Sequence, residues 1–229
     1  MDKKRIMIGI ATEAAVCTET VQSLYNMTIP EDVETELRII HSYNIADGRN
    51  ELVDIMLNEG FDYIFFVDSD VVLPQNALVD LYGMHWYFAT GTYPRKEIDT
   101  LTQINPYTTL YGHLEENKDC YCPYFMPFSE LPAGRIVQVD CCGLGCTLIH
   151  KDLFTQIERP YFFFAHEKCS EDGTRSPYCM GEDMYFSRKI VKAGLQMWAH
   201  GDVICGHVGK YIYQFPDREE MNKKLNEQQ

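Results

Sequence analysis

Two carboxylates follow one short apolar run in this chain. Residues 61–74 read FDYIFFVDSDVVLP, so a hydrophobic stretch leads directly into Asp68 and Asp70. Residues two apart in an extended chain project to the same side. Two like charges held this close repel each other unless a cation lies between them. Because a hard divalent metal prefers oxygen ligands, we predict that Asp68 and Asp70 converge on one metal ion.

Such an ion needs further ligands, and the segment HVGK at 207–210 offers His207 directly after the apolar residues DVIC. Imidazole together with two carboxylates favours Mn²⁺ or Mg²⁺. His200 is a competing candidate, and the sequence alone does not decide between the two histidines. Lys210 would place a positive charge beside the same ion.

Two further acids open the segment GEDMYFSRKIVKAG at 181–194, whose pattern predicts a helix. Glu182 and Asp183 lie in its first turn, where the helix dipole favours their charged forms. Acidic residues are also commonly found there without any function. Arg49 lies in the first turn of a second predicted helix, where a positive charge is mildly unfavourable, which favours a functional role.

The elements that position these residues alternate along the chain. Apolar runs predict strands at 5–11, 35–41 and 61–68, and helical spacing predicts helices at 46–60 and 74–86. This order predicts an α/β fold with a mainly parallel sheet flanked by helices, followed by a small mixed C-terminal part.

Ligands of such sheets bind at the carboxyl ends of the strands. The end of the first strand carries Ala11, Thr12 and Glu13. We therefore expect these three residues to lie at the same edge as the two aspartates.

Composition limits the partners and the compartment. The formal net charge is -14, which argues against a duplex nucleic-acid partner. No run approaches the roughly 20 apolar residues of a membrane span, and the N-terminus lacks a signal-peptide pattern. The nine cysteines contain no CxxC pair, so buried reduced thiols are favoured over a zinc site, and we predict a cytoplasmic protein. We expect one domain over 1–215 and a polar tail over 216–229.

Four segments, in order, resemble the nucleotide-sugar glycosyltransferases of the GT-A fold, most closely the small bacterial family-2 type. GRNELVDIMLNEG with FDYIFFVDSDVVLP is similar to that family's RN helix, third strand and DxD motif. VDCCGLGCTLIHKDLF at 139–154 resembles its glycine-rich loop, although this chain has Cys141-Cys142-Gly143 where many relatives have two glycines. GEDMYFSRKIVKAG resembles the ED motif, and HVGK the late histidine segment.

The resemblance implies a metal-dependent enzyme that moves a sugar from a UDP- or GDP-linked donor to a hydroxyl acceptor, such as a glycan, a lipid-linked sugar or a small molecule. Asp70 and His207 would bind Mn²⁺ or Mg²⁺ directly, and Asp68 would contact the ribose or reach the metal through water. The remaining donor-binding residues implied are Ala11, Thr12, Glu13, Arg49, Ser69, Gly143 and Lys210.

Acceptor chemistry needs a general base, because a hydroxyl group is a poor nucleophile. In inverting relatives the aspartate of the ED pair has this role, which implies Asp183 here, with Glu182 orienting the acceptor or the donor sugar. Trp198, close after the same helix, is the expected aromatic platform for the acceptor.

Other functions fit parts of the pattern. A retaining GT-A enzyme shares these motifs, and a haloacid-dehalogenase-like phosphatase would use the first aspartate of the DSD strand as its nucleophile. That motif normally opens the phosphatase fold, whereas two strand-helix units precede it here. A nucleotidyltransferase would need a basic glycine-rich loop after the first strand, which ATEAAVCTE lacks. A non-catalytic sugar-binding module would bind nucleotide sugars without turnover.

Overall fold

The structure of the chain, a computed structural model, describes residues 3–96, 107–111, 125–127, 130–131, 133–168, 175–209 and 212–214. Its helices are α1 (Thr18–Asn26), α2 (Ile45–Asn58), α3 (Ala77–Gly83), α4 (Lys151–Phe154) and α5 (Glu182–Lys192). Its strands are β1 (Lys4–Thr12), β2 (Val33–His41), β3 (Tyr63–Val67), β4 (Val71–Val72), β5 (Phe88–Thr92), β6 (Tyr107–Tyr111), β7 (Phe125–Pro127), β8 (Ile136–Val139), β9 (Cys141–Cys142), β10 (Cys146–His150), β11 (Ala165–Lys168), β12 (Arg175–Met180), β13 (Met197–Ile204), β14 (Gly206–Val208) and β15 (Ile212–Tyr213).

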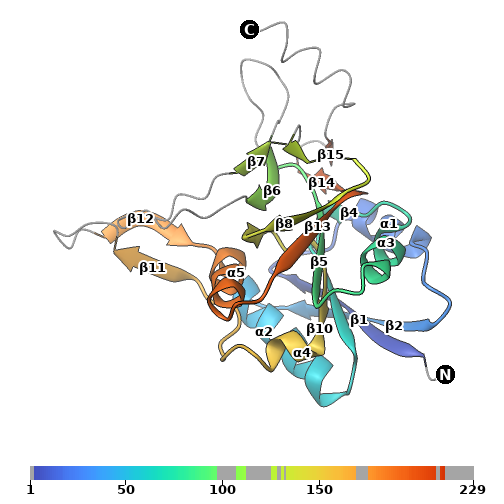
Figure 1. The fold of residues 1–229 in the computed structure, drawn as a ribbon, viewed down its shortest axis with the longest axis horizontal. Helices are drawn as coiled ribbons and strands as arrows, with labels where there is room; N and C mark the ends of the chain where they lie inside the picture. The colour runs from blue at the N-terminus through green and yellow to red at the C-terminus, as the bar shows by residue number, and fades with distance from the viewer. Residues whose placement is uncertain are drawn as a thin grey trace, which may run out of the picture.

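A seven-stranded sheet with the order β2-β1-β3-β10-β5-β13-β8 forms the centre of the fold (Figure 1). β1 pairs in parallel with both β2 and β3, and β5 pairs in parallel with β13. β10 is antiparallel to both β3 and β5, and β8 is antiparallel to β13, so only β10 and β8 run against the other five strands. The predicted mainly parallel α/β sheet is therefore confirmed.

Helices cover both faces of this sheet (Figure 1). Helices α2, α4 and α5 bury Leu52, Phe154 and Phe186 in one apolar cluster, and α3 buries Leu78 in a second cluster. Both clusters consist of fully or nearly fully buried side chains, so the sheet is a rigid support for residues at its edges.

The predicted elements agree with the observed ones to within a few residues, with one larger difference. The helix predicted over 74–86 is shorter, because α3 spans only Ala77–Gly83. Pro74 contributes a turn instead, in which its carbonyl accepts the N–H of Ala77 at 3.0 Å. His85, with a positive φ of 55°, turns the chain towards β5. The predicted tail at 216–229 lies outside the described residues.

A small three-stranded sheet, β15-β14-β4, was not predicted from the sequence and matters most for the site. β14 runs antiparallel to β4 and pairs His207 with Val71, directly after Asp70. This pairing brings the late histidine segment to the turn that follows β3.

Within the described residues, no helix combines the length and the apolar character needed to cross a bilayer.

Candidate functional site

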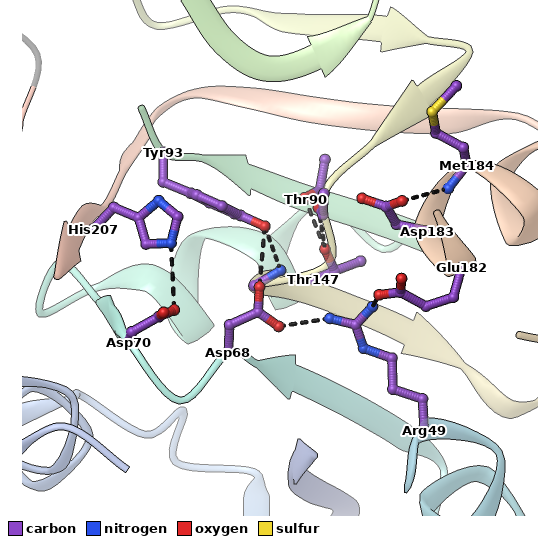
Figure 2. Close-up of polar contacts among 12 residues, drawn as sticks. Arg49, Asp68, Asp70, Thr90, Tyr93, Thr147, Glu182, Asp183, Met184 and His207 are labelled. Atoms are coloured by element: carbon purple, nitrogen blue, oxygen red, sulfur yellow. Dashed lines mark hydrogen bonds and ion pairs between the residues drawn. The ribbon is translucent and has the colours of Figure 1, made fainter. Parts of the chain in front are cut away.

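The two aspartates lie in a turn at the carboxyl end of β3, as predicted. The N–H of Asp68 donates to the carbonyl of Gly145 at 3.2 Å, and the N–H of Val71 donates to the carbonyl of Asp68 at 3.2 Å. The side chains of Asp68 and Asp70 take different partners, however (Figure 2). The site therefore has two parts, one around each carboxylate.

Arg49 is the centre of the first part. One guanidinium nitrogen donates to Asp68 Oδ1 at 2.6 Å, and the other donates to Glu182 Oε1 (Figure 2). Only 4% of Arg49 is exposed. Arg49 thereby connects the tip of β3 to the start of α5 across 133 residues of sequence.

The local sequence of α2 explains how Arg49 reaches Asp68 and Glu182. The side chain of Asn44 caps the helix by accepting the N–H of Ala46 at 2.8 Å. Gly48 then faces β1, where a Cβ atom would lie only 3.1 Å from the Cβ of Ala11. The missing side chain lets the first turn of α2 approach the sheet closely, so Arg49 reaches the buried carboxylates.

The charges of this group stabilise one another. Burial alone would lower the pKa of the Arg49 guanidinium, but the neighbouring Asp68 and Glu182 raise it above its ordinary value. Arg49 is therefore a permanent cation between two carboxylates. Without it, both acids would be left in a poorly solvated position.

Asp183 lies beside this group at the first turn of α5. Its Oδ1 atom accepts the N–H of Met184 at 2.7 Å (Figure 2). Burial, followed by the negative charge of Glu182, raises the pKa of Asp183 to about 6, although Arg49 and the Met184 N–H act in the opposite direction. A carboxylate that is ionised near neutral pH and has a pKa in this range is suited to accept a proton.

The second part of the site contains Asp70 and His207. Nε2 of His207 lies 3.3 Å from Asp70 Oδ1, and Nδ1 lies 2.9 Å from the carbonyl oxygen of Pro94. A carbonyl oxygen can only accept, so Nδ1 carries a hydrogen, and Nε2 is the ring nitrogen that faces Asp70 and could bind a metal. Lys96 donates to the other carboxylate oxygen, Oδ2. Burial would raise the pKa of Asp70, but the bonds from His207 and Lys96 outweigh it and lower this pKa below its usual value.

This donor set is suited to a divalent cation. A carboxylate oxygen and an imidazole nitrogen with a fixed tautomer converge, and both are ligand types that Mn²⁺ accepts. Among the described residues no group of three or more histidine, cysteine or acidic side chains is arranged to hold a metal. The prediction that Asp68 joins as a direct ligand is not supported, because its two oxygens bind Arg49 and Tyr93 instead. In this part of the site, Asp70 and His207 are thus two side chains whose donor atoms lie close enough together to bind one cation.

Tyr93 hydrogen-bonds to the second carboxylate oxygen of Asp68. Its hydroxyl donates to Asp68 Oδ2 at 3.3 Å and accepts the N–H of Gly145 at 3.0 Å (Figure 2). A Cβ atom on Gly143 would lie 3.0 Å from Cζ of the Tyr93 ring and closer still to the hydroxyl. Glycines are needed at positions 143 and 145 because the buried Tyr93 ring occupies the space that their side chains would take.

Replacing Gly143 with alanine should accordingly displace Tyr93 and disturb Asp68. We expect Gly143→Ala to lower the free energy of unfolding by about 1–3 kcal/mol, the usual cost of overpacking. Gly83→Ala is the matched control, because a Cβ there meets nothing within 4 Å and the residue closes a helix. Urea unfolding of both variants tests this, and equal stability of the two would contradict the packing argument.

The residues predicted at the end of the first strand lie at the same edge. Ala11 and Thr12 are buried, and Thr12 Oγ1 accepts the N–H of Ala14 at 3.2 Å. Glu13 is exposed. The carbonyl of Ser69 accepts the N–H of Cys17 at 2.7 Å, which connects the aspartate turn to the start of α1. Lys210 lies outside the described residues.

One sequence expectation, for Trp198, is corrected by its position. Met197 and Ala199 belong to the cluster that contains Phe186 of α5, so strand alternation directs Trp198 to the opposite face of the sheet from Asp183. There Trp198 stacks on Trp86, with ring centroids 4.9 Å apart. Trp198 therefore does not lie with the site as an acceptor platform.

His200, the competing candidate for the metal, lies apart from Asp70. Its Nδ1 atom accepts the N–H of Asp202 at 3.2 Å, and its strand position pairs with Ile136 of β8. His207, not His200, is the histidine that contacts Asp70.

Neither Lys96 nor the contact of Tyr93 with Asp68 was predicted from the sequence. Both follow β5, whose residues FATGT lie in a part of the chain where no strand was predicted. The signal was present, because a β-prone run that ends before Pro94 is typical of a strand and its exit turn.

Comparisons with known proteins support the fold. No protein-family model matches the chain, and no curated protein sequence matches it significantly. Two similar solved structures are the A197 protein from STIV and GalNAc-T7 crystallised with UDP, GalNAc and Mn²⁺. For A197 the TM-score is 0.58 at 18% identity, covering 93% of this chain and 95% of A197. For GalNAc-T7 the TM-score is 0.55 at 10% identity, covering 93% of this chain and 44% of GalNAc-T7.

The identities are too low to transfer an activity, and the chain spans less than half of GalNAc-T7. What they establish is the architecture, which the mixed seven-stranded sheet and its flanking helices show independently. The chain has the GT-A, Rossmann-like fold that its motifs predicted.

Proposed function

We propose that this chain is a metal-dependent glycosyltransferase that moves a sugar from a UDP- or GDP-linked donor to a hydroxyl acceptor, with inversion at the anomeric carbon. The observation that supports the proposal is that two groups of side chains with different chemistry lie at one edge of the sheet. Asp70 and His207 form a cation-binding pair, and Asp183 is a carboxylate with a raised pKa. A diphosphate leaving group needs a bound cation to stabilise its charge, and an acceptor hydroxyl needs a carboxylate to accept its proton.

The fold neighbour GalNAc-T7 was crystallised with UDP, GalNAc and Mn²⁺, which supports the same ligand classes here. In this chain Asp70 and His207 would hold the divalent ion, Mn²⁺ or Mg²⁺. When bound, such an ion neutralises the charge that develops on the departing diphosphate. An acidic protein of net charge -14 has particular need of a cation to hold an anionic donor.

The residues of the first part would orient the donor and the acceptor. Arg49 keeps Asp68 and Glu182 in fixed positions. Asp68 would contact the ribose, as the family resemblance implies. Ala11, Thr12, Glu13 and Ser69 would form the neighbouring wall of the nucleotide pocket, with Gly143 and Lys210 completing the donor contacts.

Transfer itself requires one bond to form and one to break. The acceptor oxygen would bond to the anomeric carbon while the bond from that carbon to the diphosphate oxygen breaks. The hydroxyl proton would pass to Asp183, whose Oδ1 already accepts the N–H of Met184, so that Oδ2 is the expected acceptor. Glu182, held by Arg49, would orient the reacting sugar.

The phosphatase alternative fits the geometry less well. It needs Asp68 as an accessible nucleophile, yet both oxygens of this carboxylate are engaged by Arg49 and Tyr93. A non-catalytic sugar-binding module has no need of a carboxylate whose pKa is raised to about 6.

Replacing Asp70 with asparagine tests the metal part of this proposal. We expect Asp70→Asn to weaken Mn²⁺-dependent binding of the donor at least tenfold, because one of two protein ligands loses its charge. Isothermal titration with UDP- and GDP-sugars, with and without Mn²⁺, measures this. Glu34→Gln, which removes one exposed carboxylate from β2, is the charge-matched control. Unchanged metal-dependent affinity in Asp70→Asn would rule out the assigned ligand.

A further inference from the structure

One short segment contacts all three side chains that were predicted as metal ligands. The hydroxyl of Tyr93 donates to Asp68, and the carbonyl of Pro94 pairs with His207 Nδ1. The ammonium group of Lys96 donates to Asp70. The residues 93–96 that follow β5 therefore contact Asp68, Asp70 and His207 together, and Lys96 places a side-chain cation next to Asp70.

The position of this ammonium is specific. Asp70 offers one oxygen to His207 and the other to Lys96, so the carboxylate has a cation beside it. A metal that uses Asp70 and His207 as ligands must come close to this same carboxylate. Because an ammonium and a divalent ion repel each other strongly at such a separation, the two cannot share it without cost.

The contact is also easily broken. The side chains of Lys96 and Asp70 are 38% and 28% exposed, so water can replace either partner. Exposed ion pairs of this kind contribute little net free energy. The ion pair of Asp68 with Arg49 differs from this one, because the Arg49 side chain is only 5% exposed. Breaking that pair would leave buried charges without a partner.

We propose that Lys96 is an internal, displaceable cation: it neutralises Asp70 until a divalent metal takes its place, and the released ammonium then binds the diphosphate of the donor. This inference rests on the proposed function and adds a regulated step to it. The metal and the donor would thereby be coupled, because metal binding frees a second positive charge for the same anion. Ammonium groups bind phosphate as point charges, so no further rearrangement of the site is needed.

Two effects of opposite sign follow for Lys96→Met. Without the competing ammonium, Mn²⁺ alone should bind about fivefold more tightly, the factor that corresponds to an exposed ion pair of about 1 kcal/mol. With Mn²⁺ saturating, UDP or GDP should bind about fivefold or more weakly, because one charge-assisted contact to the diphosphate is lost. A merely structural lysine would not move the two affinities in opposite directions.

The experiment measures Mn²⁺ binding by electron paramagnetic resonance of the free ion, and nucleotide binding by calorimetry, in the full chain. Lys96→Arg should retain most of the wild-type behaviour. Lys151→Met is the matched control, because the Lys151 side chain is 40% exposed and pairs with an aspartate, Asp62. Lys151 begins α4, next to the start of β3, whereas Asp70 follows the end of β3. We expect that control to leave both affinities unchanged.

Each result separates this inference from the proposed function. If wild type and Lys96→Met bind Mn²⁺ equally well, or the variant binds it more weakly, the displacement is wrong while the metal-dependent transferase stands. If neither protein binds Mn²⁺ even with a nucleotide present, the inference and the metal part of the proposed function both fail. Binding by Lys96→Met with little or none by wild type would support the inference directly.

A second measurement uses the wild-type protein and does not depend on a variant. Lys96 should react faster with an amine-selective acylating reagent after Mg²⁺ is added, because it is released from Asp70. Mass spectrometry of the digested protein gives the modification rate of each lysine, with Lys151 as the internal reference. A rate for Lys96 that is unchanged at saturating Mg²⁺ would overturn the displacement.

Discussion

Asp183→Asn should lower the turnover number of sugar transfer by about 10²–10⁴-fold, the usual contribution of a general base. The amide is nearly the same size and can still accept the N–H of Met184 through its oxygen, so α5 should begin as it does now. Donor affinity should remain close to that of wild type, because Asp70 and His207, the proposed metal ligands, are unchanged. Steady-state kinetics together with donor titration separate the two effects.

A helix-start acid outside the site provides the control. Asp152 lies in the first turn of α4 and is 52% exposed in its side chain, and Asp152→Asn should leave transfer unchanged. Near-normal turnover in Asp183→Asn would remove this residue as the base. Loss of turnover with an equal loss of donor affinity would instead make it a binding residue.

The pH dependence follows from the raised pKa of Asp183. Only the ionised carboxylate can accept the proton of the acceptor, so kcat/KM should rise with pH through about 6 and fall away below it. Arg49 lowers this pKa, so Arg49→Lys, which holds the charge less closely, should move the midpoint upwards. A midpoint that stays near the ordinary value of an aspartate would mean that another group controls the rate.

Arg49→Met should lower the free energy of unfolding by about 3–5 kcal/mol, the range measured when one partner of a buried ion pair is removed. Asp68 and Glu182 would lose their shared cation, and the side chain of Glu182 is only 11% exposed. Urea unfolding of the variant and of wild type measures this loss.

Arg159 gives the comparison for this second variant. Its side chain is 56% exposed and pairs with Asp54, so Arg159→Met should change stability little. A loss in Arg49→Met no larger than in Arg159→Met would show that the buried network does not contribute as argued. The double variant Arg49→Met with Glu182→Gln should recover part of the loss, because one uncompensated charge is removed.

The strands and the aspartate motif could be predicted because their signals are local. IFFV before Asp68 and RIMIGI before Ala11 are apolar runs of a length that only buried strands or short helix segments explain, and β3 and β1 are found there. Glu182 and Asp183 open α5 as predicted. Each of these predictions needs only a few neighbouring residues.

The interior of the site depends on contacts that no local pattern contains. β4 and β14 have two and three residues, too few for any periodicity, yet their pairing places His207 beside Asp70. The bond between Arg49 and Glu182 joins helices at opposite ends of the chain. Trp198 failed as a prediction for a related reason, since proximity to α5 in sequence says nothing about the face of β13 on which a side chain lies.

The most direct test of the central claim is a crystal structure of the full chain soaked with Mn²⁺ and UDP or GDP, with data collected at the manganese absorption edge. We expect one anomalous peak at ligand distance from the carboxylate of Asp70 and from His207 Nε2, in contact with both phosphates. Bound nucleotide with no anomalous peak at Asp70 and His207 would contradict the account.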